Sequence, residues 1–168
     1  ELSLKRLKDL TEKMAISGDE VEVRRYLEES YKSYGGELIA DNLGSIALVK
    51  KSKNPNAKTV LLLGHMDEVG FVVKSINDKG NLSLATIGGW WSQTLLGQRV
   101  LVKAKDGQKY KGTIGSIPPH LLTEADRAKP MEIKNMLVDI GCTSKDEVLA
   151  LGINTGSAVI LDGSFEVL

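Results

Sequence analysis

The stretch Gly64–Phe71 (GHMDEVGF) decides how the rest of this sequence is interpreted. It follows the apolar run TVLLL at residues 59–63, whose length and composition predict a short strand buried on both faces. Side chains two residues apart point to the same side of an extended segment, so His65 and Asp67 are expected to share one face. An imidazole and carboxylates are costly to bury without partners, so something must satisfy them.

A His-x-Asp pair at the end of a central strand is a common way to present a metal ligand beside a carboxylate. The carboxylate then orients the imidazole or assists catalysis. His65 and Asp67 are therefore candidate site residues. The alternative is a surface turn that happens to carry a histidine and acids, and the tripeptide alone does not exclude it. The apolar strand in front favours the metal interpretation, because it places the pair at the edge of a core.

Composition limits the classes of function. A chain of 168 residues can form one domain, or one domain and part of a second. Its 22 basic and 22 acidic residues give a formal net charge of zero, so neither nucleic acid nor an anionic membrane is an expected partner. No apolar run approaches the ~20 residues that span a bilayer, and the start has no signal-peptide pattern. Cys142 is the single cysteine, which fits a reducing, cytoplasmic location.

The first 58 residues predict helices followed by a hairpin. Apolar residues at helical spacing predict a helix that ends near Ser17, and Ser17 with Glu20 forms a capping box for a second helix that ends at residues 35–36. Strands are expected at 37–40 and 45–49, joined by a turn. Two helices, a hairpin and a buried strand indicate the opening of an α/β sandwich.

After Phe71 the sequence changes to short β-type runs separated by turn signals. It predicts a small β-barrel or sandwich inserted into the α/β part. A single helical turn is expected at 123–128, and Ser144 with Glu147 predicts a capped helix ending at Gly152. The expected strands are residues 71–76, 82–86, 99–103, 109–114, 136–140, 158–161 and 165–168.

Three further features have two interpretations each. The pair Trp90-Trp91 either contacts a partner chain or places one ring in the core of the β-rich part. His120 either reaches a neighbouring active site or caps a turn, and for a lone loop histidine the structural role is favoured. Cys142 near Asp139 could bind zinc, although a single cysteine without a nearby histidine argues against this.

The sequence resembles the glutamyl/deblocking aminopeptidases, a family of cytosolic metallopeptidases that assemble into tetrahedral dodecamers. The segment at 64–71 resembles the first metal motif of that family. Further segments resemble the family in the same order along almost the whole chain, and as a set they are specific. These are residues 41–45 (DNLGS), 88–91 (GGWW), 112–121 (GTIGSIPPHL) and 138–141 (VDIG).

The resemblance implies a three-layer α/β metallopeptidase catalytic domain with a small inserted β-barrel for dimerisation. On this basis residues 1–70 are the N-terminal part of the catalytic domain, 71–163 the inserted domain, and 164–168 the start of the return. The family binds two divalent ions, zinc or cobalt most often and manganese in principle, and it cleaves N-terminal residues from peptides. His65 then corresponds to a metal ligand, and Asp67 to the catalytic-site carboxylate that orients its ring.

The sequence also departs from this family. The other metal ligands and the general base lie, in the family, beyond the inserted domain, where this chain stops. We therefore expect an incomplete and inactive portion of an aminopeptidase. Two alternatives remain: a non-catalytic self-association module acting through the β-rich part, and an endoglucanase-type glycoside hydrolase. The second needs two carboxyl groups flanking a sugar cleft, whereas Asp67 and Glu68 are expected to point apart.

Overall fold

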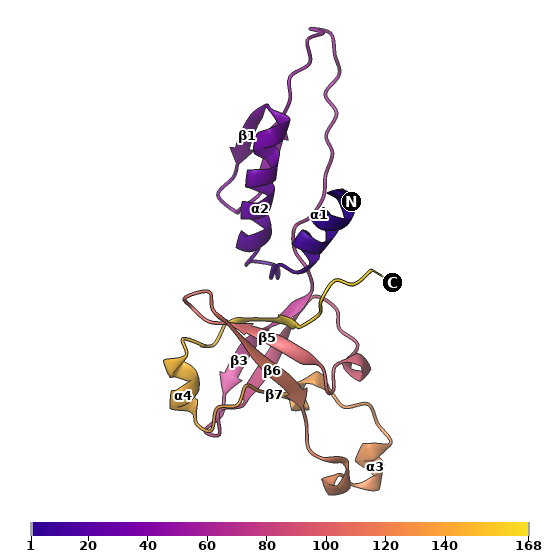
Figure 1. The fold of residues 1–168 in the computed structure, drawn as a ribbon. Coiled ribbons are helices and arrows are strands. Elements are labelled where there is room, and N and C mark those ends of the chain that lie inside the picture. Colours follow the sequence, from indigo (N-terminus) through magenta and orange to yellow (C-terminus); the bar gives the residue numbers. More distant parts are fainter. Residues whose placement is uncertain (1, 168) are drawn as a thin grey trace. The chain divides into compact units, whose positions relative to one another are not determined.

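The computed structural model describes residues 2–167, which divide into two compact units. We call Val69–Ser164 the barrel unit, and the residues up to Glu68 together with the segment from Phe165 the N-terminal unit. Helices and a hairpin make up one unit and a closed barrel the other, which confirms the predicted α/β class with a small β-barrel (Figure 1). Within residues 2–167 no helix combines the length and hydropathy needed to traverse a bilayer.

The N-terminal unit contains the predicted helices and hairpin. Asp41 closes the hairpin turn, because one of its carboxylate oxygens accepts hydrogen bonds of 2.9 Å from the backbone N–H groups of Leu43 and Ser45. The two strands pair antiparallel with Glu37 opposite Val49. The elements are α1 (Leu2–Thr11), α2 (Val21–Tyr31), the 3₁₀ turn η1 (Lys32–Tyr34), β1 (Glu37–Ala40) and β2 (Ile46–Val49).

Two predicted strands of this unit are wrong. Residues 59–63 form no strand, and Val60, Leu61, Leu62 and Leu63 have exposed fractions of 79, 70, 90 and 86%. A buried strand needs neighbours on both edges, and β1 and β2 pair only with each other in a two-stranded sheet. Residues 165–167 are not a strand either: the Phe165 N–H donates instead to Glu12 Oε1 at 3.1 Å. Leu168 lies outside the described residues.

The barrel unit closes six antiparallel strands in the order β3-β4-β7-β6-β5-β8. Closure depends on β8, which pairs with β3 on one side and β5 on the other, so that Val159 faces both Phe71 and Val102. The turn signals predicted a small barrel or a sandwich, and the structure has the barrel. The strands are β3 (Gly70–Ile76), β4 (Leu82–Ile87), β5 (Arg99–Lys103), β6 (Lys109–Gly115), β7 (Leu137–Asp139) and β8 (Ala158–Leu161).

Alternating side chains fill the barrel. Val100 and Val102 on β5 are fully buried, whereas the alternating residues Leu101 and Lys103 are partly exposed, as the sequence alternation predicts. Other fully buried members of this core are Phe71, Val73, Leu82, Leu95, Val138, Val148, Ile153 and Val159.

Short helical elements cover the connections of the barrel unit. Both predictions here are confirmed: Thr123 caps α3 (Glu124–Arg127), and Ser144 caps α4 (Lys145–Ala150) by accepting a 3.2 Å hydrogen bond from the Glu147 N–H. The remaining elements are the 3₁₀ turns η2 (Ser92–Thr94), η3 (Pro119–Leu121) and η4 (Ile133–Asn135).

The two tryptophans have different environments. The Trp90 ring stacks on Phe71 with centroids 4.6 Å apart, and its Nε1 donates to the Gly70 carbonyl at 2.9 Å. Trp91 is 72% exposed. The core interpretation therefore holds for Trp90, and the contact interpretation stays open for Trp91.

Candidate functional site

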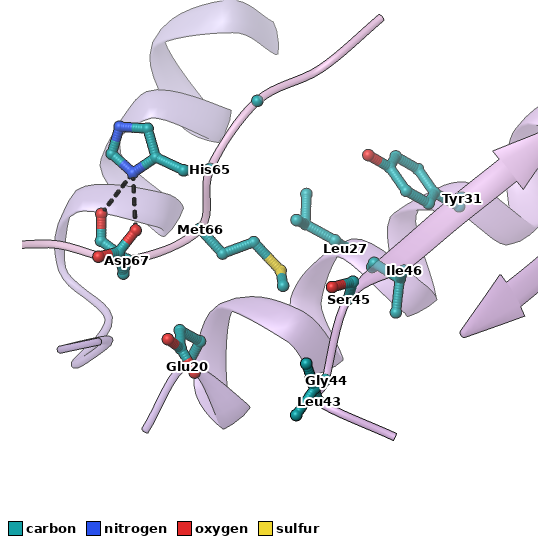
Figure 2. Close-up of a pocket in the computed structure, with 11 residues that line it drawn as sticks. Glu20, Leu27, Tyr31, Leu43, Gly44, Ser45, Ile46, His65, Met66 and Asp67 are labelled. Carbon is teal, nitrogen blue, oxygen red and sulfur yellow. Dashed lines mark hydrogen bonds and ion pairs between the residues drawn. The ribbon is translucent and has the colours of Figure 1, made fainter. Parts of the chain in front are cut away.

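His65 and Asp67 lie together at the end of the extended 59–64 segment, both in the N-terminal unit (Figure 2). His65 Nδ1 is 2.9 Å from the Asp67 backbone carbonyl and 2.9 Å from Asp67 Oδ1. Both of these atoms are acceptors, so Nδ1 carries the hydrogen and, in the neutral ring, Nε2 carries the lone pair. The His65 side chain is 84% exposed. The geometry thus presents an accessible imidazole nitrogen that can coordinate a cation.

Asp67 is held from two sides. Oδ1 accepts from His65, and Oδ2 accepts a hydrogen bond from the Ser17 hydroxyl. The Ser17 hydroxyl and, after it, His65 lower the pKa of the Asp67 carboxyl below its ordinary value. Asp67 is therefore a carboxylate at neutral pH, and it favours the imidazole tautomer with hydrogen on Nδ1.

The capping box predicted for Ser17 is wrong. The residue at the N-terminal boundary of α2 is Glu20, and it makes no side-chain capping hydrogen bond. The Glu20 carboxylate accepts from the Gly18 N–H at 2.7 Å instead. The Ser17 hydroxyl is directed to Asp67, a residue 50 positions further along the chain. Sequence reasoning missed Ser17 as a site residue because no local pattern connects it with Asp67.

A short parallel contact brings these two segments together. Ile16 forms an isolated parallel bridge with Glu68, and the Glu68 N–H donates to the Ala15 carbonyl at 2.7 Å. The Ala15 N–H donates in return to Glu68 Oε1 at 3.2 Å. Met14, Ala15 and Ile16 are at most 2% exposed. The segment before Ser17 is therefore fixed beside the segment that carries Asp67.

The two adjacent carboxylates have separate partners. Asp67 bonds His65 and Ser17, whereas Glu68 bonds the backbone of Ala15. A glycosidase needs a pair of carboxyl groups facing one cleft, one of them an acid with a raised pKa. The pKa of Asp67 is shifted in the opposite direction. This arrangement does not support the glycoside hydrolase alternative.

A cavity of about 250 Å³ lies next to the His65 segment. Met66 points into it towards Leu27 and Ile46, while the His65 ring lies on the other side of the chain (Figure 2). The side-chain alternation expected from the extended sequence is therefore present, although the segment is not paired as a strand. The cavity is lined by polar residues as well, among them Glu20, Ser45 and His65.

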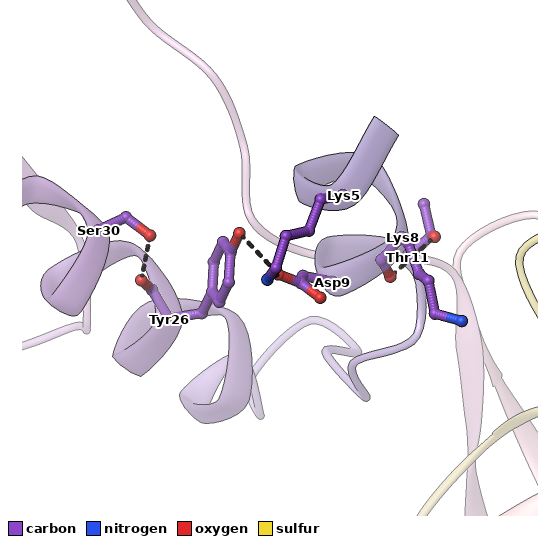
Figure 3. Close-up of polar contacts among 6 residues, drawn as sticks. All are labelled: Lys5, Lys8, Asp9, Thr11, Tyr26 and Ser30. Atoms are coloured by element: carbon purple, nitrogen blue, oxygen red, sulfur yellow. Dashed lines mark hydrogen bonds and ion pairs between the residues drawn. The ribbon is translucent and has the colours of Figure 1, made fainter. Parts of the chain in front are cut away.

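Polar contacts hold α1 against α2, the helices before and after the Ser17 segment (Figure 3). Tyr26 on α2 donates its hydroxyl to Asp9 Oδ2 on α1 at 3.2 Å, and Lys5 Nζ is 2.7 Å from the same oxygen. The Lys5 ammonium group is the main cause of a lowered pKa at Asp9. The Lys13 ammonium lies 5.1 Å from the centre of the Tyr26 ring. These contacts help to fix the connection that carries Ser17.

Other candidate ligands lie in the barrel unit. His120 is an exposed residue of η3. Asp139 Oδ1 accepts from the Gly141 N–H at 2.8 Å, and burial raises the pKa of the Cys142 thiol. Among residues 2–167 no three histidine, cysteine or acidic side chains gather closely enough to hold a metal ion. Within the described part of the chain, His65 with its carboxylate partner is one side of a possible metal site.

Comparison with known proteins adds an independent result. A protein-family profile described as M42 glutamyl aminopeptidase matches residues 44–168. The chain is 35% identical over 156 residues to a glutamyl aminopeptidase of Lactococcus lactis, covering 92% of this chain and 44% of that protein. It therefore spans about half the length of the relatives it matches.

Solved structures give the same result for the fold. A TET aminopeptidase from Thaumarchaeota archaeon SCGC AB-539-E09 superposes with a TM-score of 0.92 at 40% identity, covering 99% of this chain and 46% of that one. The TET1 peptidase of Pyrococcus horikoshii, described as assembling into a tetrahedron or a large octahedral shell, superposes with a TM-score of 0.84 at 29% identity. That match covers 98% of this chain and 48% of that one.

Proposed function

The chain belongs to the M42 glutamyl aminopeptidase family, and we propose that it is the amino-terminal part of a metal-dependent aminopeptidase that removes N-terminal residues from peptides. One observation supports this most directly: His65 exposes Nε2 while Asp67 accepts the hydrogen of Nδ1. A metal-binding histidine commonly has a carboxylate on its second nitrogen, because this fixes the ring and raises its basicity. The surface-turn alternative offers no reason for that arrangement.

In this proposal His65 binds one divalent ion through Nε2, and Asp67 orients the ring. Zinc and cobalt suit an imidazole, and manganese is a further possibility. When bound, a pair of such ions lowers the pKa of a water molecule and polarises the scissile carbonyl. A zinc site takes three or four protein ligands, and the described residues contribute His65. We propose that the remaining ligands belong to sequence that follows residue 168 in the intact protein.

The first test uses the 168-residue chain itself. We expect no hydrolysis of aminoacyl-nitroanilides with added Co²⁺ or Zn²⁺, because one imidazole does not hold a catalytic ion. The measurement is release of nitroaniline against a blank without protein. Turnover above that blank would contradict the proposal that this portion is inactive.

The second test uses the protein extended through the reading frame beyond Leu168. We expect aminopeptidase activity that His65→Gln abolishes and that Asp67→Asn lowers by about 10- to 100-fold, the usual effect of removing the partner of a metal-bound histidine. Lys58→Ala, an exposed change on the same segment, serves as the control. Full activity of His65→Gln would refute the assigned role of His65.

A second candidate function is self-association through the barrel unit. Trp91 supports this function, because its side chain is 72% exposed while the neighbouring Trp90 ring packs on Phe71 of the core. Exposed aromatic side chains are enriched at protein interfaces. We propose that Trp91 contacts a second copy of the chain.

A cytoplasmic location stays a prediction.

Sedimentation velocity tests the self-association proposal. Trp91→Ala should weaken self-association without altering the circular dichroism of the barrel, whereas Gln93→Ala, an exposed change in the neighbouring η2 turn, should leave it unchanged. An assembly that is the same in the wild type and in Trp91→Ala would exclude this role for Trp91.

A further inference from the structure

We propose that Ser17 is a positioning residue for the His65 imidazole: its hydroxyl holds the Asp67 carboxylate in the rotamer that keeps hydrogen on His65 Nδ1. The inference rests on the proposed function, because positioning the His65 ring matters for function only if His65 Nε2 binds a cation. It extends the site by one residue, to a relay from Ser17 through Asp67 to His65.

The orientation of Asp67 requires a second partner. A carboxylate that bonds only the imidazole can rotate about its side-chain torsions and exchange that contact for water, because the Asp67 side chain is 36% exposed. The Ser17 hydroxyl occupies Oδ2 while Oδ1 faces His65. With both oxygens bonded, the carboxylate has one orientation, and the imidazole takes the tautomer that this orientation selects.

Ser17 itself is held by backbone contacts. The buried segment before it is bridged to Glu68, and the Asp19 N–H donates to the Ile16 carbonyl at 2.8 Å, which closes a turn around Ser17. Gly18 in this turn has a φ of +90°, a conformation that favours glycine. These contacts fix the backbone of Ser17 at a place from which its hydroxyl reaches Asp67.

The helix offers no competing explanation for this serine. Ser17 lies three residues before Glu20, the residue at the N-terminal boundary of α2, so it is not in the capping position, and its hydroxyl bonds Asp67. Ser17 is also exposed, so it adds little to the core. Its one described side-chain contact is directed at the site.

Nitrogen-15 NMR of the histidine rings tests the inference on the 168-residue chain without metal. The chain has two histidines, and a His65→Gln sample assigns the signals. The spectra are recorded at pH about 8.5, two units above the ordinary pKa of histidine. We expect wild-type His65 to show hydrogen on Nδ1, and Ser17→Ala to populate the tautomer with hydrogen on Nε2. Ser17→Thr, which keeps the hydroxyl, should restore the wild-type spectrum.

Ser33→Ala is the matched control. Ser33 is likewise an exposed serine of the N-terminal unit, and its hydroxyl bonds the Ser30 carbonyl at 2.9 Å. This control should leave the His65 tautomer unchanged. A Ser17→Ala spectrum identical to the wild type, or a wild-type His65 with hydrogen on Nε2, would overturn the inference.

Metal affinity of the extended protein gives the second readout. Removing the carboxylate partner of a bound histidine weakens metal affinity by about 10- to 100-fold, so removing the group that orients that carboxylate should weaken it by about 3- to 10-fold. Titration with Co²⁺ measures this in Ser17→Ala, Ser17→Thr and Ser33→Ala. Equal affinity in Ser17→Ala and the wild type would count against Ser17.

The two proposals fail in different ways. If His65→Gln binds Co²⁺ as the wild type does, the metal role of His65 is wrong, whatever the tautomer spectra show. If His65→Gln loses the metal while Ser17→Ala changes neither tautomer nor affinity, the metal role stands and the positioning role of Ser17 is wrong.

Discussion

The barrel unit and the N-terminal unit differ in how their extended segments pair through backbone hydrogen bonds. Each barrel strand has a partner on both sides, because β8 closes the sheet between β3 and β5. In the N-terminal unit β1 and β2 form a two-stranded sheet, and residues 59–63 run beside them without forming a strand. The barrel sheet is closed within the described residues, whereas the N-terminal unit exposes apolar side chains such as Leu62 and Leu63.

The core residues follow the same division. The barrel core is one cluster of fourteen buried apolar side chains. Among the described residues of the N-terminal unit, four are buried: Met14, Ala15, Ile16 and Val23. Closing a sheet removes its edges and encloses its inward-facing side chains at once. The candidate site lies in the N-terminal unit, which has the smaller buried core.

Hydrogen exchange should separate the two units most strongly. We expect amides of β3 to β8 to exchange more slowly than those of residues 59–63 by a factor of about 10³ or more, because barrel amides open only with unfolding. Exchange followed by mass spectrometry of peptides measures this. Protection of residues 59–63 similar to that of β3 would mean that this segment pairs in solution, within or between chains, and the contrast would disappear.

A pair of large-to-small changes tests the same contrast energetically. Phe71 is fully buried and stacks on Trp90, so Phe71→Ala should lower the free energy of unfolding by about 3–5 kcal/mol. Leu62 is 90% exposed, and Leu62→Ala should change it by less than about 0.5 kcal/mol. Urea unfolding followed by far-ultraviolet circular dichroism, which reports the helices of the N-terminal unit as well as the barrel strands, gives both values. A destabilisation of 2 kcal/mol or more in Leu62→Ala, on the scale of a buried leucine, would show that this side chain is covered in solution.

The sequence predicted the barrel well because its signals are local. Each strand is a short alternating run, and the turns between strands contain glycines with positive φ, such as Gly80 and Gly107. Of the two predicted capping boxes, the one at Ser144 is confirmed, because its hydroxyl oxygen accepts from the Glu147 N–H and no distant group competes for it among the described contacts. The box at Ser17 has the same spacing but a distant partner, Asp67.

The errors concern partners that are distant in sequence. Residues 59–63 have the composition of a buried strand, but composition does not name the strands that would flank it. Ser17 had a plausible local partner at the start of α2, a backbone N–H from which its oxygen would accept as a cap, but its hydroxyl instead donates to the Asp67 carboxylate 50 residues away. His65 and Asp67 could be paired from the sequence because they are two residues apart, whereas the third member of their site could not.

A pair of glycines in β6 tests how tightly the barrel is closed. A Cβ on Gly112 would lie 2.8 Å from Val138 Cγ1 and 2.9 Å from the Asp139 carbonyl oxygen, so the neighbouring β7 would have to move. Gly112→Ala should destabilise the protein by about 1–3 kcal/mol.

Gly115→Ala is the matched control on the same strand, because a Cβ there would meet no atom within 4 Å. Thermal unfolding by circular dichroism compares the two. Equal melting temperatures for both variants would mean that β6 and β7 separate easily, and the barrel would be looser than its contacts indicate.

The smallest expected effect concerns the first turn of α4. The Thr143 N–H donates to Glu147 Oε2 at 2.6 Å, and the Thr143 hydroxyl adds contacts of 3.1 Å to both carboxylate oxygens. The backbone N–H, followed by the hydroxyl, lowers the pKa of Glu147 below its ordinary value of 4.5. Because the folded pKa is the lower one, the stabilisation is complete above about pH 4.5 and is lost as the pH falls through the folded value.

Melting temperatures between pH 7 and pH 3 should reveal this window. Wild type should exceed Glu147→Gln at pH 7, and the gap should shrink as the pH drops below about 4.5, since protonation removes the same negative charge that the substitution removes. A gap for Glu147→Gln that does not change with pH would mean that the stabilising role of Glu147 does not depend on its charge.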